Sequence, residues 1–182
     1  WIGTLAPAEI AAEIARSLDL LTAPERANAG ERQRSMRAVF EQSWRLLTRD
    51  EQRALAAVSL FRGGFTREAA ADIAGASLPM LPALLSKALL QRGANGRYDM
   101  HELVRQFAAE QLARDDALAQ AASDRHTRHF LGLLAEAEPK LRSAEQASML
   151  GRLLADVDNL RAAWDRAVAR GQLAEINLAM RG

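Results

Sequence analysis

Residues 77–100 read SLPMLPALLSKALLQRGANGRYDM, and the change of pattern within this stretch decides the fold. Leucines recur at helical spacing from Leu81 onward, which predicts a helix over about 78–90. The second half places Asn95-Gly96 between two short, partly alternating runs, a pattern typical of a β-hairpin. A helix that leads directly into a hairpin over residues 90–100 indicates the end of a winged-helix arrangement, in which two further helices come first.

Two helices are expected upstream of this stretch. Thr48 and Glu51 form a capping box, which predicts a helix over residues 49–60. Thr66 can cap a second helix, over residues 66–74, and a glycine follows it. These helices, the helix near residues 78–90 and the hairpin complete the predicted winged helix.

Further helices flank this core on both sides. Apolar residues at helical spacing predict helices over residues 35–47 and 101–114, which would pack around the winged helix. A short helix is expected over residues 7–21, and the polar residues 22–34 that follow it are interpreted as a linker. Both ends of the chain look cut from a longer protein, because each lies in or beside an apolar periodic stretch.

The C-terminal third is expected to be helical throughout residues 117–182. Phe130 marks one helix and a leucine row from Leu150 to Trp164 marks another, with Pro139 separating them. Antiparallel helices of this size resemble the start of a helical-repeat array. The sequence therefore predicts a mainly α fold: a winged-helix domain with a small β-hairpin wing, followed by antiparallel helices.

Composition excludes several classes of function. Hydrophobic residues make up 49% of the 182 residues, and 24 basic against 23 acidic residues leave a formal net charge of +1. Such a balance gives no general attraction to nucleic acid or to an anionic membrane. The chain has no Cys, no apolar run near the roughly 18 residues of a membrane span and no signal-peptide pattern. A cytoplasmic location without membrane contact is expected.

Three segments together resemble one family. They are residues 34–47 (RSMRAVFEQSWRLL), residues 59–70 (SLFRGGFTREAA) and residues 97–108 (RYDMHELVRQFA). They are similar to the winged-helix domain of the signal-transduction ATPases with numerous domains, the STAND class, which includes plant disease-resistance proteins and apoptotic protease-activating factors. The resemblance covers residues 5–114 well and continues more loosely through residues 158–161 (DNLR) and Trp164.

The resemblance implies a domain organisation and a place in a larger bacterial regulator. Residues 1–34 would be the C-terminal helix of a nucleotide-binding region plus a linker, residues 35–114 the winged helix, and residues 115–182 a tetratricopeptide-like region. The longer parent would bind ADP or ATP with Mg²⁺, whereas this fragment is expected to hold no cofactor. Its implied partner is the parent's own nucleotide-binding domain, and the activated parent is expected to self-associate.

The family's MHD motif falls on Met100, His101 and Glu102, with Glu in place of Asp. The resemblance implies that His101 approaches the β-phosphate of bound ADP and holds the closed, inactive state of the parent. The residues agree with this role, because His101 lies where a strand is expected to give way to a helix N-terminus, which favours phosphate. From spacing alone, a histidine that only caps the helix explains the pattern more often.

The remaining patterns point away from catalysis and metal binding. The sequence contains no G-x-x-x-x-G-K-[ST] loop and no apolar strand ending in paired acids, so no catalytic residue is assigned. His126 and His129 lie near Asp124 on one expected helix, and a solvated helix face explains them better than a metal site. The arginines between residues 32 and 53 are also interpreted as a solvated face, partly paired through a ladder of Arg37, Glu41 and Arg45.

Two other functions remain open. A winged helix can read DNA with its third helix, which would make the chain a transcription factor. That helix carries a single cation, Lys87, whereas neutralising phosphates needs several, so specific DNA binding is not expected. A plain helical scaffold is the weaker alternative. The sequence therefore predicts a non-catalytic regulatory fragment that couples the nucleotide state of its parent to a helical sensor.

Overall fold

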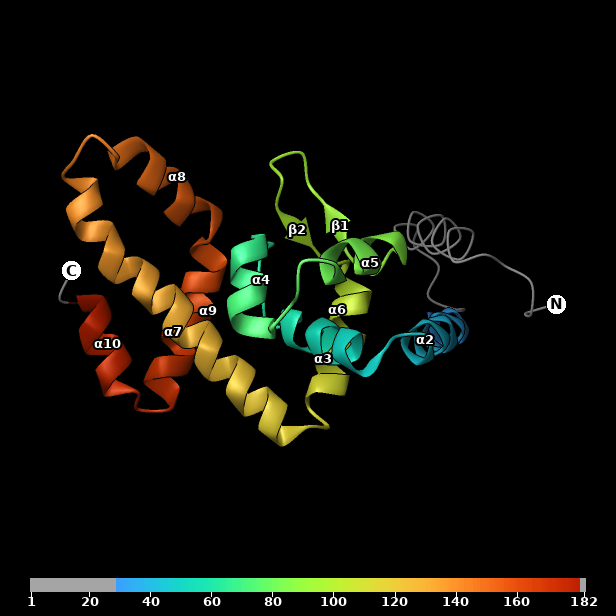
Figure 1. Ribbon diagram of the computed structural model, residues 1–182. Coiled ribbons are helices and arrows are strands. Elements are labelled where there is room, and N and C mark those ends of the chain that lie inside the picture. The colour runs from blue at the N-terminus through green and yellow to red at the C-terminus, as the bar shows by residue number, and fades with distance from the viewer. Residues whose placement is uncertain (1–28, 181–182) are drawn as a thin grey trace.

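The computed structural model describes residues 29–180, so the expected helix over residues 7–21 lies outside the described residues. The described part is mainly helical, with one two-stranded antiparallel sheet, which confirms the predicted fold class (Figure 1). The elements in chain order are α2 (Ala29–Arg45), α3 (Arg49–Val58), α4 (Arg67–Ala74), α5 (Met80–Ser86), β1 (Gln91–Arg92), β2 (Tyr98–Asp99), α6 (Glu102–Leu112), α7 (Asp116–Leu141), α8 (Gln146–Ala155), α9 (Val157–Ala169) and α10 (Leu173–Met180).

Helices α3 and α4 begin where local chemistry predicts, and α4 also ends there, whereas α3 ends two residues before the predicted residue 60. The Thr48 hydroxyl accepts from the Glu51 amide and the Glu51 carboxylate accepts from the Thr48 amide, so the capping box is confirmed. Thr66 caps α4, and Gly75 ends it in the left-handed conformation. The N-termini of both helices are therefore fixed by nearby side chains, and the C-terminus of α4 by the conformation of a glycine.

The hairpin has a third, minimal strand beside it. Gln91 pairs with Asp99 and Arg92 with Tyr98. Phe65, which precedes α4, exchanges both of its backbone hydrogen bonds with Tyr98 at 2.8 Å. The base of the hairpin is thus tied to the loop between α3 and α4, which gives the order helix, short strand, two helices and hairpin.

A continuous apolar core joins the first and second halves of the described chain. Phe61 stacks on Phe65 with ring centroids 4.5 Å apart and meets Phe130 of α7 edge-on at 6.1 Å. Leu160 and Ala163 of α9 belong to the same buried cluster. Because α4, α7 and α9 share this core, the hairpin-bearing half and the C-terminal helices pack directly on one another (Figure 1).

Several element boundaries differ from the sequence prediction. Helix α2 begins at Ala29, so the linker interpretation of residues 22–34 is wrong over 29–34, where ERQR supplies good helix formers. Pro139 does not separate two helices, since it lies in the last turn of α7, and the separation comes at residues 142–145. The leucine row that was expected to form one helix forms two, α8 and α9, which meet at Asp156.

Helix α5 is shorter at its C-terminus than predicted because Ala88 adopts a left-handed φ of 52°. The Leu89 amide then bonds the Leu84 carbonyl and the Ala88 amide bonds that of Leu85, as in a Schellman motif. This turn directs Leu89 and Leu90 into the core. Glycine usually occupies this position, so an alanine there gave no signal in the sequence.

Within the described part of the chain, no helix combines the length and the apolar character that crossing a bilayer requires.

Candidate functional site

His101 occupies the turn between β2 and α6, where the sequence predicted it. It is the N-cap of α6, with φ of −58° and ψ of 141°, and its Nδ1 accepts a hydrogen bond from the Leu103 amide at 3.2 Å. Met100, just before it, is buried in the core. His101 therefore caps α6, as the sequence pattern alone suggested.

Capping determines which nitrogen of His101 can donate. In a neutral imidazole one ring nitrogen accepts and the other carries the proton. Since Nδ1 accepts from Leu103, the proton lies on Nε2, and no other described residue is hydrogen-bonded to this ring. His101 is half-buried, so the turn presents one N–H donor next to a helix N-terminus.

Arg105 holds this turn in place from one helical turn further on. The residue is only 7% exposed. It donates to Asp99 Oδ1 and the Met100 carbonyl, each at 2.9 Å, to Glu102 Oε2 at 3.2 Å, and to the Phe61 carbonyl. A buried arginine with four acceptors thus holds the backbone before His101 and the carboxylates on either side of it. No role was predicted for Arg105, although the two acids at positions 99 and 102 were an available signal.

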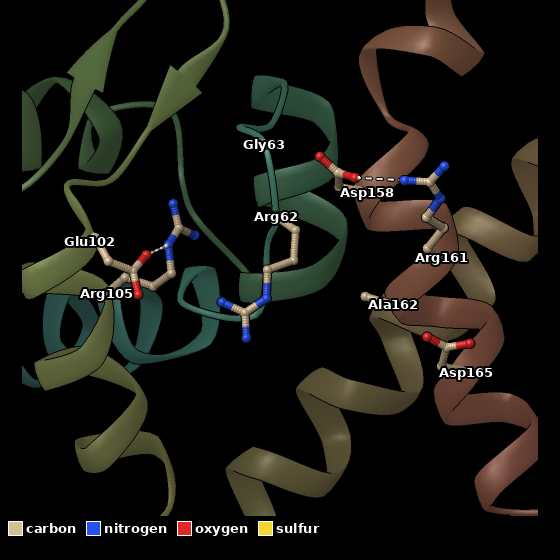
Figure 2. A pocket seen from close by; sticks show the side chains of 8 residues that line it. All are labelled: Arg62, Gly63, Glu102, Arg105, Asp158, Arg161, Ala162 and Asp165. Carbon is tan, nitrogen blue, oxygen red and sulfur yellow. Dashed lines mark hydrogen bonds and ion pairs between the residues drawn. The ribbon is translucent and has the colours of Figure 1, made fainter.

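A shallow pocket opens beside this turn. It has a volume of about 480 Å³ and lies between the α3–α4 loop, the start of α6 and α9 (Figure 2). Arg62 reaches into the space between α6 and α9, and across from it Arg161 pairs with Asp158 at 3.4 Å. The lining residues are Arg62, Gly63, Glu102, Arg105, Asp158, Arg161, Ala162 and Asp165.

The charges around the pocket limit what it can bind. Arg105 neutralises part of the negative charge of Asp99 and Glu102 through its two ion pairs. The Glu102 side chain remains 63% exposed, and Asp158 and Asp165 add further negative charge. The lining therefore mixes three arginines, Arg62, Arg105 and Arg161, with three acids, and His101 lies outside it.

His126 contradicts the interpretation of a solvated helix face. Its side chain is fully buried on α7 between Phe61 and Phe130, with ring centroids at 5.6 and 4.7 Å. Burial lowers the pKa of His126 to about 3, helped by the nearby Arg166 guanidinium, with a smaller opposing effect from Asn159. His126 is therefore a neutral core residue, packed there because α7 must face α9 and the α3–α4 loop.

His129 and Arg37, one of the arginines between residues 32 and 53, pair with carboxylates of the described chain. His129 Nδ1 lies 3.0 Å from Asp72 of α4, so its partner comes from another helix. The residues that the structure describes contain no group of three or more His, Cys, Asp or Glu able to hold a metal ion. Arg37 pairs with Glu41 at 3.4 Å as predicted, and with Glu110 of α6 at 2.6 Å.

Comparison with known proteins gives partial matches. No family model matches the chain. The chain is 29% identical over 184 residues to "Putative HTH-type transcriptional regulator Rv0890c" of Mycobacterium tuberculosis and to its counterpart Mb0914c in Mycobacterium bovis. The match covers 96% of this chain and 20% of each relative, so the chain spans about a fifth of the length of the curated relatives it matches.

One solved structure is similar at lower identity. It is a STAND protein with a tetratricopeptide repeat sensor from Pyrococcus horikoshii, with a TM-score of 0.46 and 19% sequence identity. The alignment covers 97% of this chain and 34% of that protein.

Proposed function

We propose that this chain is a non-catalytic regulatory module of a longer nucleotide-switch protein, in which the β2–α6 turn senses bound ADP. Two independent observations support the proposal. The segments around residues 34–47, 59–70 and 97–108 resemble the STAND winged helix. The chain also matches about a fifth of much longer proteins named as transcriptional regulators, which leaves room for a nucleotide-binding domain and an effector domain.

The observation that carries the proposal is the geometry of His101. Its Nδ1 caps α6 by accepting from Leu103, which leaves Nε2–H as a donor at the edge of the domain. A phosphate group supplies the acceptor that such a donor requires. Arg105 keeps the turn rigid by bonding the backbone before it and the carboxylates on either side. A rigid turn loses little conformational freedom when it binds, which favours a sensor.

In this proposal ADP ties the winged helix to the nucleotide-binding domain of the same chain. Because ADP would bind more tightly to the closed arrangement, it would shift the population toward that state. Exchange for ATP would release the module and permit self-association of the parent. The proposal assigns His101 the contact with phosphate and gives Met100 the supporting role of anchoring the turn in the core.

The test must separate capping from phosphate contact, because His101 does the first and is proposed to do both. In the longer protein, His101→Asn keeps a side-chain oxygen that can cap α6, since asparagine is a good N-cap. It loses the Nε2 donor. A hydrogen bond to a charged group contributes about 1.5–3 kcal/mol, so ADP affinity measured by calorimetry should fall by about tenfold to a hundredfold.

The matched control is thermal unfolding of the 182-residue chain. His101→Asn should leave its melting temperature nearly unchanged, whereas His101→Ala should lower it through loss of the cap. If ADP affinity in the longer protein is the same with Asn as with His, the residue is a cap and the proposal is wrong. Purified chain with Mg-ATP should release no phosphate above a buffer control, because the sequence contains no phosphate-binding loop.

A second candidate function is direct DNA binding, which the names of the relatives favour. It requires α5 to present cations to the phosphate backbone. Lys87 instead lies 2.6 Å from Glu51 of α3, and an apolar side chain, Leu78, is exposed just before α5, at 69%. A gel-shift titration of the chain at physiological salt separates the two candidates, since nanomolar, sequence-selective binding would favour the transcription-factor function.

A further inference from the structure

The peptide group between Phe61 and Arg62 is held at both ends by residues from two different helices. Arg105 of α6 donates to the Phe61 carbonyl oxygen. Asn159 of α9 accepts, through Oδ1, from the Arg62 amide at 2.6 Å. The carbonyl and the amide belong to one planar peptide group, so they reorient together. A rotation of the group that breaks one of the two hydrogen bonds therefore disturbs the other.

Asn159 is well placed to hold this group. It is fully buried, and its Nδ2 donates to the Gly64 carbonyl at 2.9 Å and to Asp156 Oδ1 at 3.1 Å. All three polar contacts of its amide are therefore made inside the protein. Losing the side chain would leave the partly buried Arg62 amide and the buried Gly64 carbonyl without this partner, which is costly in a medium of low dielectric.

The loop that carries the peptide group has little stiffness of its own. It reads FRGGF over residues 61–65, and Gly63 and Gly64 both have positive φ, at 70° and 84°. Consecutive glycines give the backbone many alternative conformations. The orientation of the Phe61–Arg62 peptide must therefore come from its partners, Arg105 and Asn159, rather than from the loop.

We propose that Asn159 of α9 is a positioning residue for the β2–α6 turn, acting through the Phe61–Arg62 peptide and Arg105. The C-terminal helices thereby influence the turn that contains His101 through a chain of hydrogen bonds. A shift of α9 moves the peptide, the peptide moves the Arg105 guanidinium, and Arg105 bonds the Met100 carbonyl and Asp99 on the two residues before His101. The polar route is continuous and lies mostly out of contact with solvent.

The test in the 182-residue chain uses nuclear magnetic resonance and needs no nucleotide. Asn159→Ser removes the acceptor for the Arg62 amide. We expect the ring nitrogen signals of His101 to move away from the single Nε2–H tautomer, and exchange of the Leu103 amide with solvent to rise by about tenfold. An amide of α3, such as that of Leu55, serves as the reference, because a general loss of stability would raise both exchange rates equally.

Two control variants isolate the peptide route. Leu131→Ala truncates a fully buried side chain of α7 and leaves the hydrogen bonds of Asn159 in place. It should lower stability without changing the His101 tautomer. Arg161→Ala, on the exposed side of α9, should change neither. If Leu131→Ala shifts His101 as much as Asn159→Ser does, the effect is general destabilisation and the proposal is wrong.

If Asn159→Ser does not fold, the coupling can be tested in the opposite direction, by changing Arg105 and observing Asn159. Arg105→Lys keeps a charge but loses the fork of donors. It should shift the side-chain amide signals of Asn159 on α9. The two side chains are connected here only through the Phe61–Arg62 peptide group, which both of them bond. Unchanged Asn159 signals would overturn the proposal.

The consequence for signalling rests on the proposed ADP sensor. In the longer protein, Asn159→Ser should weaken ADP binding by several-fold, less than His101→Asn does. Failure of the His101 experiment alone would remove the nucleotide function and leave the coupling measured in the chain intact.

Discussion

Lys87 and Glu51 form a partly buried ion pair, with Nζ 2.6 Å from Oε1, and it joins the C-terminus of α5 to the first turn of α3. The other oxygen of Glu51 accepts from the Thr48 amide at 2.8 Å. Burial raises the pKa of Glu51, but the bonds from Lys87 and Thr48 outweigh it, so the pKa is lowered overall. The only cation of residues 77–90 thus has a structural role.

Lys87→Ala should therefore affect stability rather than DNA affinity. Leaving the mostly buried Glu51 without this partner should cost about 1–3 kcal/mol of unfolding free energy. Residual, non-specific binding of duplex DNA should keep the same salt dependence, measured by fluorescence anisotropy. A lysine that contacted phosphate would instead reduce the slope of log affinity against log salt by about one, and that result would contradict the assignment.

Phe40→Ala should lower the melting temperature strongly. Phe40 is 5% exposed and packs against Phe107 of α6, with ring centroids 6.0 Å apart. Truncating a buried phenylalanine typically costs about 3–5 kcal/mol. Arg45→Ala is the matched control on the same helix, because Arg45 is exposed, and it should change the melting temperature little. Equal, small effects of the two substitutions would mean that α2 is not packed on α6.

The features that the sequence predicted are those that neighbouring residues determine. The capping box of Thr48 and Glu51 and the glycine stop at Gly75 depend on groups within a few residues, and the hairpin depends on Asn95-Gly96. His101 was placed correctly at a strand-to-helix turn for the same reason. Its role toward nucleotide stays a prediction, because it depends on a domain that lies outside the chain.

The features that were missed depend on distant partners. Arg105 bonds a carbonyl 44 residues away and Asn159 an amide 97 residues away, so neither of these two contacts has a local signature. The break at Asp156 falls where its carboxylate accepts from Arg97 and Asn159. His126 looked exposed because polar residues surround it in sequence, and only the packing of α7 against the α3–α4 loop buries it.

Buried His126 should make stability depend on pH. Its pKa is about 3 in the folded chain, below the ordinary value of 6.5. Above pH 6.5 the His126 side chain is neutral in both the folded and the unfolded chain, so its contribution to the free energy of unfolding does not change with pH. As the pH falls below 6.5 the unfolded chain binds a proton that the folded chain excludes, so stability declines by about 1.4 kcal/mol per pH unit until roughly pH 3.

Denaturant unfolding between pH 7 and pH 4.5 measures this slope. His126→Leu removes the titrating group and should flatten the curve over that range, whereas His129→Gln on the same helix should leave it steep. Carboxylates such as Glu51 begin to protonate at the acid end of this window, but they do so in the original chain and in both variants alike, so the difference between the curves reports His126. A slope that survives in His126→Leu would show that another group is responsible.

Gly64 and Gly75 offer a matched pair that separates backbone strain from steric clash. Both have positive φ, at 84° and 65°, so alanine at either position should cost about 1–2 kcal/mol for the left-handed conformation. A Cβ on Gly75 would meet no atom within 4 Å, but one on Gly64 would lie 2.9 Å from the Tyr98 carbonyl oxygen. That oxygen accepts from the Phe65 amide, so it cannot retreat without breaking the strand pairing at the base of the hairpin. Gly64→Ala should therefore cost a further 1–3 kcal/mol or so through overpacking, which urea denaturation of the two variants would resolve. If the two substitutions cost the same, the contact between the α3–α4 loop and β2 is looser than the structure has it, and the loop would be free to move independently of the hairpin.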